Sequence, residues 1–403
     1  MERVPGATVG VVGGGQLGRM LAEAASPLGV DVVALDPTPD CPAVPPAADQ
    51  VVAAFDDVEA VRDLAERADV LTYEIELADP DVLADAAAAA DVEVHPTPDT
   101  LRTIQDKLVQ NRALAAAGVP VPAFEPVDGA TDLEAAFDAL GRPLMLKRRT
   151  GGYDGRGNAP VASVAGAREE FGGDLDGFVA EELVDFEREL SVVAARGDDE
   201  TATFPVAENV HEAEVLRESV VPARTSDAVR DEATTVARDV LDALDGSGVF
   251  GVELFERASQ RDADGASGDS RDREVLVNEI APRPHNSGHY TIEGCHTSQF
   301  EQHARAVLGL PLGDTTLRAP TVMANVLGEP DAETRPAVLD EPRLAVHWYG
   351  KREVRPLRKL GHVTAVGADR DELLARARAA RDALALRPGT ETPSDPADHT
   401  PHS

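Results

Sequence analysis

The chain has 403 residues, more than one hydrophobic core usually organises, so we expect two to four packed domains. Its 73 acidic and 38 basic residues give a formal net charge of −35, which would repel nucleic acid and anionic membrane surfaces. Two cysteines without CxxC spacing, and no apolar run of signal or membrane-helix length, predict a cytoplasmic protein without a disulfide framework.

The basic residues are almost all arginines, and acidic residues are spread along the whole sequence. This distribution is typical of a solvated surface adapted to a salt-rich cytoplasm. The four lysines are Lys107, Lys147, Lys351 and Lys359. Where lysine is so scarce, each one that remains is a candidate for a site that needs a compact ammonium charge, such as a phosphate site. From composition alone, chance retention explains them equally well.

The first hundred residues alternate strand-like and helical segments, which predicts a parallel α/β domain over residues 1–96. The expected elements are 7–12, 17–28, 30–35, 51–53, 70–73, 82–90 and 92–95. A helix is expected over 97–117, and the segment 118–122 with its glycine and two prolines ends it. A second unit therefore begins near this point.

The rest of the chain has a mixed α+β pattern. Expected elements are a helix at 133–140, strands at 144–148, 178–182 and 189–194, a mixed segment to about 310, strands at 321–327, 345–349 and 362–366, and a helix at 371–386. The polar segment 257–273 lies between two apolar strands, which predicts a surface hairpin insertion with little order. Residues 311–388 should form a small β-rich domain, and residues 389–403 a disordered tail.

A glycine-rich loop follows the first predicted strand and opens a helix. Gly13, Gly15 and Gly18 satisfy the pattern G-x-G-x-x-G, and Asp36 closes the next strand. A dehydrogenase that binds NAD is therefore one hypothesis. The remaining sequence does not resemble a dehydrogenase, however, and glycines before a helix N-terminus suit any phosphate, including that of a nucleotide monophosphate.

A second glycine-rich loop follows a strand that carries Lys147 and ends at Gly157. This arrangement suits a triphosphate, because the ammonium group neutralises charge while the glycine backbone supplies hydrogen-bond donors. An ordinary hairpin is the alternative, since Gly-Gly and Asp-Gly are turn dipeptides. Polar side chains concentrated in so acidic a chain favour the phosphate site: Lys147, Arg148, Arg149, Tyr153, Asp154 and Arg156.

Two carboxylates lie inside apolar runs that we interpret as buried strands, Glu253 in residues 249–255 and Glu279 in residues 275–280. A buried charge is costly unless it is paired or bound to a metal. Antiparallel pairing of the two strands around the insertion would bring the acids together. Magnesium held by Glu253 and Glu279, with Asn278 beside them, is one interpretation, and an ion pair with an arginine is the alternative.

Two further polar clusters follow. Residues 283–289 gather hydrogen-bonding side chains that a core would not select, which indicates a substrate-binding loop. Residues 351–359 contain five basic residues in nine positions, which marks an anion site in this acidic chain.

Taken together, four motifs resemble the 5-(carboxyamino)imidazole ribonucleotide synthase (PurK) family of ATP-grasp enzymes. They are GGGQLGRM at 13–20, KRRTGGYDGRG at 147–157, NEIAPRPHNSGH at 278–289 and HWYGKREVRPLRKLGH at 347–362. The resemblance spans nearly the whole chain and implies an α/β and α+β architecture. This comprises an N-terminal pre-ATP-grasp domain at 1–96, an ATP-grasp region at 97–310 divided between 97–187 and 188–310, and the C-terminal domain at 311–388.

The resemblance implies that ATP lies between two α+β subdomains, with two lysines on its phosphates and the second glycine loop as a lid. The implied nucleotide-binding residues are Lys107, Lys147, Gly152, Tyr153, Asp154, Gly155, Arg156, Gly157, Asn158, Glu181, Glu182, Leu183, Val184, Glu189, His211, Asn278 and Glu279. Among these, the segment 181–184 would lie along the adenine and Glu189 would hold the ribose. The family usually has arginine where this chain has Lys107, which matters if that contact is bidentate.

The resemblance also implies the reaction and its other residues. ATP and bicarbonate would form carboxyphosphate, which carboxylates aminoimidazole ribonucleotide in purine biosynthesis, with Mg²⁺ held by Glu253 and Glu279. Substrate-binding residues would be Gly15, Gln16, Leu17, Glu74, His285, Asn286, Ser287, Lys351 and Arg358. Catalytic residues would be Tyr153, Asp154, Arg156 and Arg283. One residue is inserted near Arg352 relative to the family pattern, which affects the assignment of charges in the basic cluster.

The family suggests a homodimer as the assembly. Alternative functions are another ATP-grasp ligase, such as a formate-using transformylase or a biotin carboxylase, and a non-catalytic nucleotide-binding regulator. The motifs at 283–289 and 347–362 argue against the other ligases. The two candidate metal carboxylates and the lid argue against the regulator.

Overall fold

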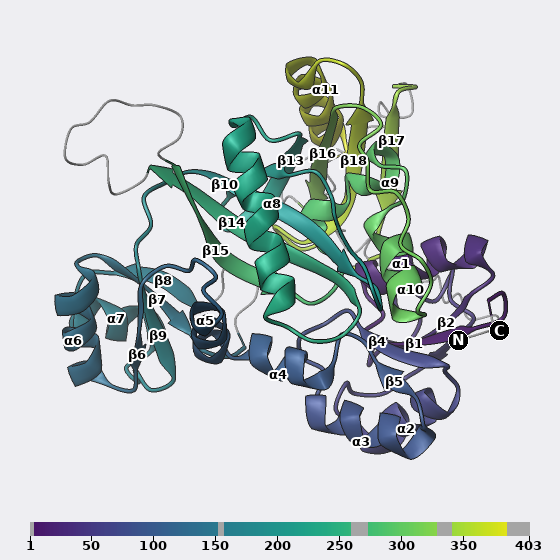
Figure 1. Ribbon diagram of the computed structural model, residues 1–403, viewed down its shortest axis with the longest axis horizontal. Helices are drawn as coiled ribbons and strands as arrows, with labels where there is room; N and C mark the ends of the chain where they lie inside the picture. The colour runs from purple at the N-terminus through teal and green to yellow at the C-terminus, as the bar shows by residue number, and fades with distance from the viewer. Residues whose placement is uncertain (1–3, 152–156, 259–272, 329–340, 385–403) are drawn as a thin grey trace, which may run out of the picture.

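The computed structural model describes residues 4–151, 157–258, 273–328 and 341–384. These residues form three β-sheets, and Figure 1 shows the small antiparallel sheet and the N-terminal sheet lying apart, with the large sheet between and above them. The segments at 152–156, 259–272 and 389–403 lie outside the described residues, and they contain most of the expected lid, most of the insertion and the expected tail. None of the helices in the described part is long and apolar enough to cross a membrane.

The N-terminal sheet has five parallel strands in the order β3-β2-β1-β4-β5. Its strands are β1 Thr8–Val12, β2 Asp31–Leu35, β3 Asp49–Val51, β4 Val70–Tyr73 and β5 Glu93–Val94; its helices are α1 Gln16–Ala25, the 3-10 turn η1 Ser26–Leu28, α2 Val58–Glu66, α3 Pro80–Ala90 and α4 Pro98–Gln105. Strands β1 and β4 are almost wholly buried because helices cover both faces of a parallel sheet. The parallel α/β prediction is confirmed.

The second sheet is antiparallel, in the order β6-β9-β7-β8. It comprises β6 Phe124–Val127, β7 Leu144–Arg148, β8 Asn158–Val161 and β9 Phe178–Glu182, with α5 Lys107–Ala116, α6 Ala130–Leu140 and α7 Val164–Phe171 around it. Leu144 and Leu146 of β7 pack toward α6 and α7. Because side chains alternate along a strand, Lys147 lies on the opposite face, toward α5.

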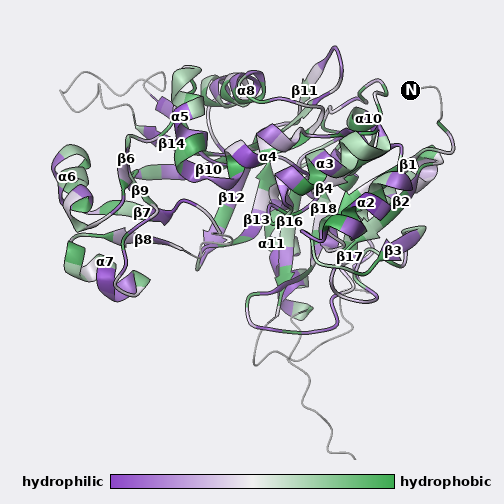
Figure 2. Cartoon of the chain, turned by 90° about the horizontal axis from the view of Figure 1, so that it is seen from below, coloured by the Kyte–Doolittle hydropathy of each residue, from purple (hydrophilic) through white to green (hydrophobic). Residues whose placement is uncertain are grey.

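The large sheet has nine strands in the order β15-β14-β10-β12-β13-β16-β18-β17, with β11 paired to β10. Its elements are β10 Phe186–Arg196, β11 Thr201–Thr203, β12 Ala207–Glu212, β13 Val215–Val221, α8 Asp227–Asp242, β14 Gly248–Ala258, β15 Arg273–Ala281, η3 Asn286–Gly288, α9 Thr291–Gly294, α10 Gln299–Val307, β16 Thr321–Leu327, β17 Leu344–Trp348, β18 Lys359–Val366 and α11 Arg370–Ala383. Figure 2 shows hydrophilic and hydrophobic residues together on α2 and α8, as expected of helices that cover a sheet with one face.

Helix α8 covers one face of β10, β14 and β15, and the opposite face carries polar side chains. Phe250, Val252 and Leu254 of β14 pack against α8, together with Val277 and Ile280 of β15. A register shift leaves one extra residue, Asn278, between the pairs Leu254–Val277 and Glu253–Glu279. This bulge directs both Asn278 and Glu279 away from α8, although adjacent strand residues normally point to opposite faces.

Helix α10 joins the N-terminal sheet to the large sheet. Phe300, Ala304 and Val307 complete the hydrophobic core around α1 and β1. The buried side chain of His303 lies 2.8 Å from Thr72 Oγ1 on β4 through Nε2, and its Nδ1 accepts the Val249 N–H of β14 at 3.1 Å. Burial lowers the pKa of His303 to about 3, so the neutral ring can accept this bond. The two sheets therefore meet through a fixed polar contact.

One expected element differs in the structure, and one element was not expected. The helix expected over 97–117 is broken at Asp106, whose extended backbone separates α4 from α5 and whose carboxylate caps α5 by accepting the N–H groups of Leu108 and Val109. The helix α2 was not expected. The strands of the C-terminal region extend the large sheet, because β16 pairs with β13.

Candidate functional site

The first glycine loop encloses a carboxylate of the protein itself. Glu74, which follows β4, accepts the backbone N–H of Gly18 at 2.6 Å and also that of Gly15. A Cβ atom at Gly13 would lie 2.4 Å from the Glu74 side chain, and one at Gly15 would lie 2.8 Å from it. Close approach of Glu74 therefore accounts for these glycines, whereas the sequence had suggested a phosphate in this position.

Glu74 lies at the N-terminus of α1, where free N–H groups favour a negative charge. Burial nevertheless raises its pKa to about 7, since the hydrogen bonds from Gly18 and Gly15 only partly offset the loss of water. Asp36 accepts the N–H of Gly14 at 3.0 Å on the other side of the loop. The loop is thus held in shape by two acidic side chains of the N-terminal domain.

The buried ammonium group of Lys147 lies where the small sheet meets the large one. Its Nζ lies 2.7 Å from Glu181 Oε2 on the neighbouring strand β9 and donates to Asn278 Oδ1 on β15 at 3.2 Å. Glu181 also accepts from Asn111 Nδ2 of α5 at 2.9 Å. Three elements that are distant in sequence therefore position this one cation.

Lys107 is the first residue of α5, and its Nζ lies 3.9 Å from Glu279 Oε1. Asp106 sets this placement, because its carboxylate caps α5 directly before Lys107. The same carboxylate accepts a hydrogen bond from Arg149 Nη2 at 2.6 Å, which ties the start of α5 to the end of β7. The backbone N–H of Lys107 donates to the Arg149 carbonyl at 2.9 Å. Asp106 was not singled out from the sequence; an Asp before a helical run is the signal that could have identified it.

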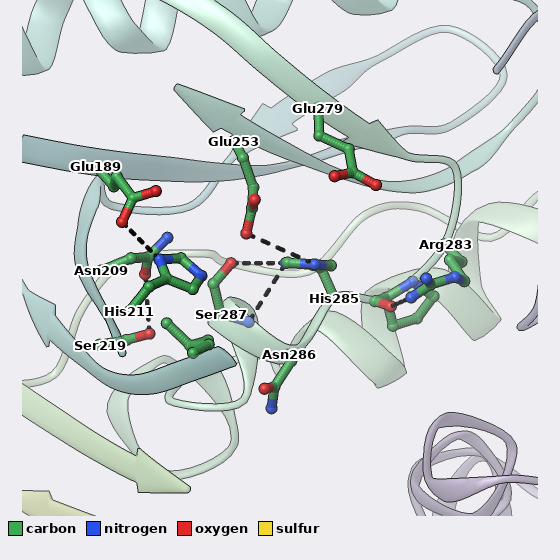
Figure 3. A network of polar contacts seen from close by, with 12 residues as sticks. Glu189, Asn209, His211, Ser219, Glu253, Glu279, Arg283, His285, Asn286 and Ser287 are labelled. Atoms are coloured by element: carbon green, nitrogen blue, oxygen red, sulfur yellow. Dashed lines mark hydrogen bonds and ion pairs between the residues drawn. The ribbon is translucent and has the colours of Figure 1, made fainter. Parts of the chain in front are cut away.

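Glu253 and Glu279 lie directly opposite each other on β14 and β15, as the sequence predicted. Figure 3 shows both side chains, with Glu189 of β10, extending from neighbouring strands toward one region. Within the described part of the chain, neither Glu253 nor Glu279 pairs with an arginine. His285 Nε2 lies 3.8 Å from Glu253 Oε1, and Lys107 Nζ lies near Glu279. The alternative of a buried arginine pair is therefore not supported.

Burial raises the pKa of Glu253 to about 7, and the charge of Glu279 adds to this effect while His211 opposes it. Two carboxylates on facing strand positions repel each other unless a cation lies between them. Oxygen ligands of this kind suit Mg²⁺. The raised pKa of Glu253 and the facing carboxylates therefore fit a magnesium ion at this position.

Polar side chains continue this surface across β10 and β12. His211 lies 2.7 Å from Glu189 Oε2 through Nδ1. Burial lowers the pKa of His211, but the bond to Glu189 and the charge of Glu253 outweigh it, so the pKa is raised overall. Ser191 Oγ and Asn209 Nδ2 are buried beside these residues and have no hydrogen-bond partner among the residues described. Neither residue was identified from the sequence, because the residues around them come from other strands that are distant in sequence.

The segment expected along the adenine leaves β9 at its end. Glu182 lies 2.9 Å from Arg257 Nη1 and accepts the Ala123 N–H, while Leu183 is exposed and Val184 partly buried. Asn158 begins β8 and Gly157 directly precedes it, whereas Gly152, Tyr153, Asp154, Gly155 and Arg156 lie outside the described residues. The roles expected for this group stay predictions.

The loop after β15 faces Glu253 on one side and the N-terminal domain on the other. Ser287 donates its N–H to His285 Nδ1 at 3.4 Å, which places the ring proton on Nε2, facing Glu253. Gly251 permits this approach, because a Cβ there would lie 2.4 Å from the His285 Cβ. Burial, followed by the charge of Arg283, holds the pKa of His285 well below its usual range.

Arg283 reaches the N-terminal domain, where its Nη2 lies 2.8 Å from Glu76 Oε1. Burial lowers the Arg283 pKa, but the charge of Glu76 and its hydrogen bond outweigh this and raise it overall. The Nε of Arg283 is buried without a partner among the described residues. Glu76 was not singled out from the sequence, although it lies two residues after Glu74. Asn286 instead turns into the interior and exchanges hydrogen bonds with Asn325.

The basic cluster contributes to the same region. Lys351 Nζ donates to Gln16 Oε1 at 2.7 Å, so the 351–359 segment meets the first glycine loop, where Leu17 is buried. Arg358 instead lies 3.3 Å from Glu353 within its own segment. Lys359, the first residue of β18, is close enough to lower the pKa of both Glu253 and His285, although burial and other charges act more strongly. The four lysines thus all border the region between the sheets.

Comparison with known proteins defines the class first. Residues 112–300 match the ATP-grasp domain, residues 6–105 the ribonucleotide synthetase preATP-grasp domain, and residues 321–376 the phosphoribosylaminoimidazole carboxylase C-terminal domain. The chain is thus an ATP-grasp protein with a preATP-grasp domain before the ATP-grasp domain and a carboxylase-type C-terminal domain after it.

The particular family follows from whole-chain relatives. The N5-carboxyaminoimidazole ribonucleotide synthase of Brucella melitensis is 42% identical over 374 residues, which cover 90% of this chain and 97% of the relative. A solved synthetase of this name in its ADP complex is 38% identical with a TM-score of 0.84, covering 95% of this chain and 98% of the other. The Aspergillus clavatus synthase in complex with ADP and 5-aminoimidazole ribonucleotide is 35% identical with a TM-score of 0.84, covering 94% and 98%. The chain belongs to the N5-carboxyaminoimidazole ribonucleotide synthase (PurK) family.

The raised pKa of Glu253 predicts a pH-dependent stability. A carboxyl with a pKa of about 4.5 when unfolded and about 7 when folded binds its proton more tightly in the folded state, so its contribution to the free energy of unfolding falls as pH rises from 4.5 to 7. The Glu253→Gln variant should gain up to ~3 kcal/mol over the parent chain as pH passes through this range. Urea unfolding at pH 5 and pH 8 with a chelator present measures this.

Glu74 also has a raised pKa, so the parent chain alone would not isolate Glu253. The difference between parent and Glu253→Gln at each pH removes that contribution. An equal difference at both pH values would contradict the assignment.

Proposed function

We propose that this protein is an ATP-dependent ligase that carboxylates 5-aminoimidazole ribonucleotide with bicarbonate, giving 5-(carboxyamino)imidazole ribonucleotide, ADP and phosphate in purine biosynthesis. The observation that carries this proposal is the convergence of Lys107 and Lys147 with Asn278, Glu279 and Glu253 between two sheets. Family membership supports the substrate, because a solved relative is in complex with ADP and 5-aminoimidazole ribonucleotide. We further propose that the enzyme acts in the cytoplasm.

The chemistry requires charge on the terminal phosphates of ATP to be neutralised while the phosphoryl group passes to bicarbonate. Lys147 and Lys107 would bind those phosphates with their ammonium groups, and Glu253 and Glu279 would hold Mg²⁺, which supplies further neutralisation. Glu181 and Asn278 hold the ammonium group of Lys147 in place before ATP binds, so little reorganisation is needed. His211 would fix Glu189 toward the ribose hydroxyls through their hydrogen bond.

Carboxyphosphate, formed from bicarbonate and the γ-phosphoryl group, hydrolyses readily, so the site must exclude water. We propose that residues 152–158 close over the nucleotide, and that Tyr153, Asp154 and Arg156 then contact the reacting groups. The amine of the ribonucleotide would attack carboxyphosphate, or the CO₂ it releases, near Arg283. The ribonucleotide itself would lie between the first glycine loop, the loop 283–287, and Lys351 with Arg358. The contact of Lys351 with Gln16 supports this position.

The substrate requirement tests the function directly. ADP release should depend on both aminoimidazole ribonucleotide and bicarbonate, and replacement of bicarbonate by formate, or of the ribonucleotide by biotin, should leave only background release. The assay measures ADP with a coupled enzyme in bicarbonate-depleted buffer. Release that follows formate or biotin would assign the chain to another ATP-grasp activity.

Two variants test the phosphate and metal roles. Lys147→Met and Glu279→Gln should each lower ADP formation by about 100-fold or more, because each removes a charge that the transferring phosphoryl group needs. Arg148→Met is the matched control for the lysine, since Arg148 lies over the Phe178 ring at 4.8 Å on the other face of β7. Glu274→Gln is the control for the acid. Glu274 lies on β15, as Glu279 does, but it pairs with Arg257 of β14 at 2.9 Å.

Both controls should retain near-normal ADP formation. The proposed roles fail if Lys147→Met or Glu279→Gln turns over at the parent rate. They also fail if a control variant that remains folded loses activity to the same extent.

We also propose that the enzyme is an acidic, salt-adapted homodimer. With a net charge of −35, the acidic side chains of the folded protein should repel one another at low ionic strength, and salt screens this repulsion. Activity and the midpoint of thermal unfolding should therefore rise from low to molar KCl. Light scattering should give a mass twice that of the chain. A flat salt response would contradict the adaptation, and a monomer mass would contradict the dimer.

A further inference from the structure

Two histidines of the C-terminal strands face each other across neighbouring strands. His347 of β17 and His362 of β18 occupy directly opposite positions, and their rings stack with centroids 4.6 Å apart. Glu293 of the short helix α9 reaches the same place, where its Oε1 lies 2.7 Å from His347 Nε2. Three elements therefore bring two imidazoles and one carboxylate together.

This cluster contains polar atoms that the protein does not satisfy. Glu293 Oε2 and His362 Nε2 are buried and have no hydrogen-bond partner in the described part of the chain. One ligand atom from each of Glu293, His347 and His362 lies within 4.8 Å of the others. Buried polar atoms in folded proteins almost always have a partner, so a missing species of complementary chemistry is indicated.

The hydrogen bonds around His362 leave its Nε2 with a lone pair. The His362 ring is fully buried, and a neutral imidazole carries one proton, on either Nδ1 or Nε2. Its Nδ1 lies 2.9 Å from the hydroxyl of Tyr349, which donates in turn to Asn325 Oδ1 at 3.5 Å. When the Tyr349 hydroxyl proton points to Asn325, the Tyr349 oxygen accepts a hydrogen bond from His362 Nδ1–H, so Nε2 carries the lone pair. In histidines that bind metals, a second hydrogen-bond partner fixes the tautomer in this way.

We propose that Glu293, His347 and His362 form a binding site for a divalent cation of the zinc class, separate from Glu253 and Glu279. Two imidazoles and one carboxylate suit Zn²⁺, whereas Mg²⁺ prefers oxygen ligands alone. Zinc bonds of about 2 Å require ligand atoms to lie about 3.3 Å apart. Glu293 and His347 can turn inward to meet this distance, because their side chains are 23% and 25% exposed. The buried His362 would serve as the fixed ligand.

A cation at this position would join α9 to the β17–β18 pair. The segment that follows β17 carries Tyr349 and Lys351, and Lys351 contacts Gln16 of the first glycine loop. The site would therefore stabilise the position of the basic segment without contacting the nucleotide. Its detection does not depend on enzymatic activity.

Zinc titration of the full chain tests the proposal. Protein without a histidine tag, kept in millimolar MgCl₂ to fill hard oxygen sites, should bind one equivalent of Zn²⁺ by calorimetry and show a raised Tm. Glu293→Gln and His347→Gln should each weaken this binding at least tenfold. Glu93→Gln is the matched control, because Glu93 forms an exposed pair with His95 at 3.4 Å elsewhere, and it should bind Zn²⁺ as the parent does.

Co²⁺ gives an independent readout, since its visible absorption reports nitrogen and oxygen ligation and should be lost in Glu293→Gln. The proposal is overturned if the parent binds no stoichiometric Zn²⁺, or if Glu293→Gln and His347→Gln, shown to be folded by circular dichroism, bind as the parent does. It is also overturned if Glu253→Gln alone abolishes the binding. A crystal with only a water between His362 and Glu293 after a zinc soak, without anomalous signal, would do the same.

Discussion

The buried ammonium group of Lys147 is the contact around which the two sheets of the central region are arranged. A lone cation inside a protein is costly, so it needs acceptors on more than one side. Glu181 supplies one from the same sheet, and Asn278 supplies the other from the large sheet. The interaction therefore fixes the distance between two subdomains and also places a positive charge at their junction. Structural and chemical requirements coincide in a single side chain.

The remaining charges are arranged around this junction. Lys107, from a helix whose start is set by Asp106, approaches Glu279, while Lys359 lies close enough to influence Glu253. Lysine is thus scarce in this acidic chain, and the four lysines that it has lie around the region between the sheets. The net charge of −35 disfavours anion binding over most of the chain, whereas the few ammonium groups lie where we propose that an anion binds.

Sequence patterns predict the local elements well, since β4, β7, β9 and β16 follow directly from short apolar runs. They also predict that Glu253 and Glu279 face each other, because only two strands and their hairpin need to be recognised. Features set by distant partners were missed or misinterpreted. Asp106 breaks a helix and binds Arg149, Glu74 accepts N–H groups of the first glycine loop, and the C-terminal strands pair with an existing sheet. None of these partners is adjacent in sequence.

The bulge at Asn278 has a consequence for how this strand can vary. Deletion of one residue there would restore regular alternation and turn Glu279 toward the apolar face of helix α8, or move Ile280 out of the core. Folding and the metal binding that we propose for Glu279 would then be lost together, although no proposed ligand had been substituted. The bulge that places Asn278 and Glu279 on one face of β15 therefore also means that β15 cannot lose a residue at this point.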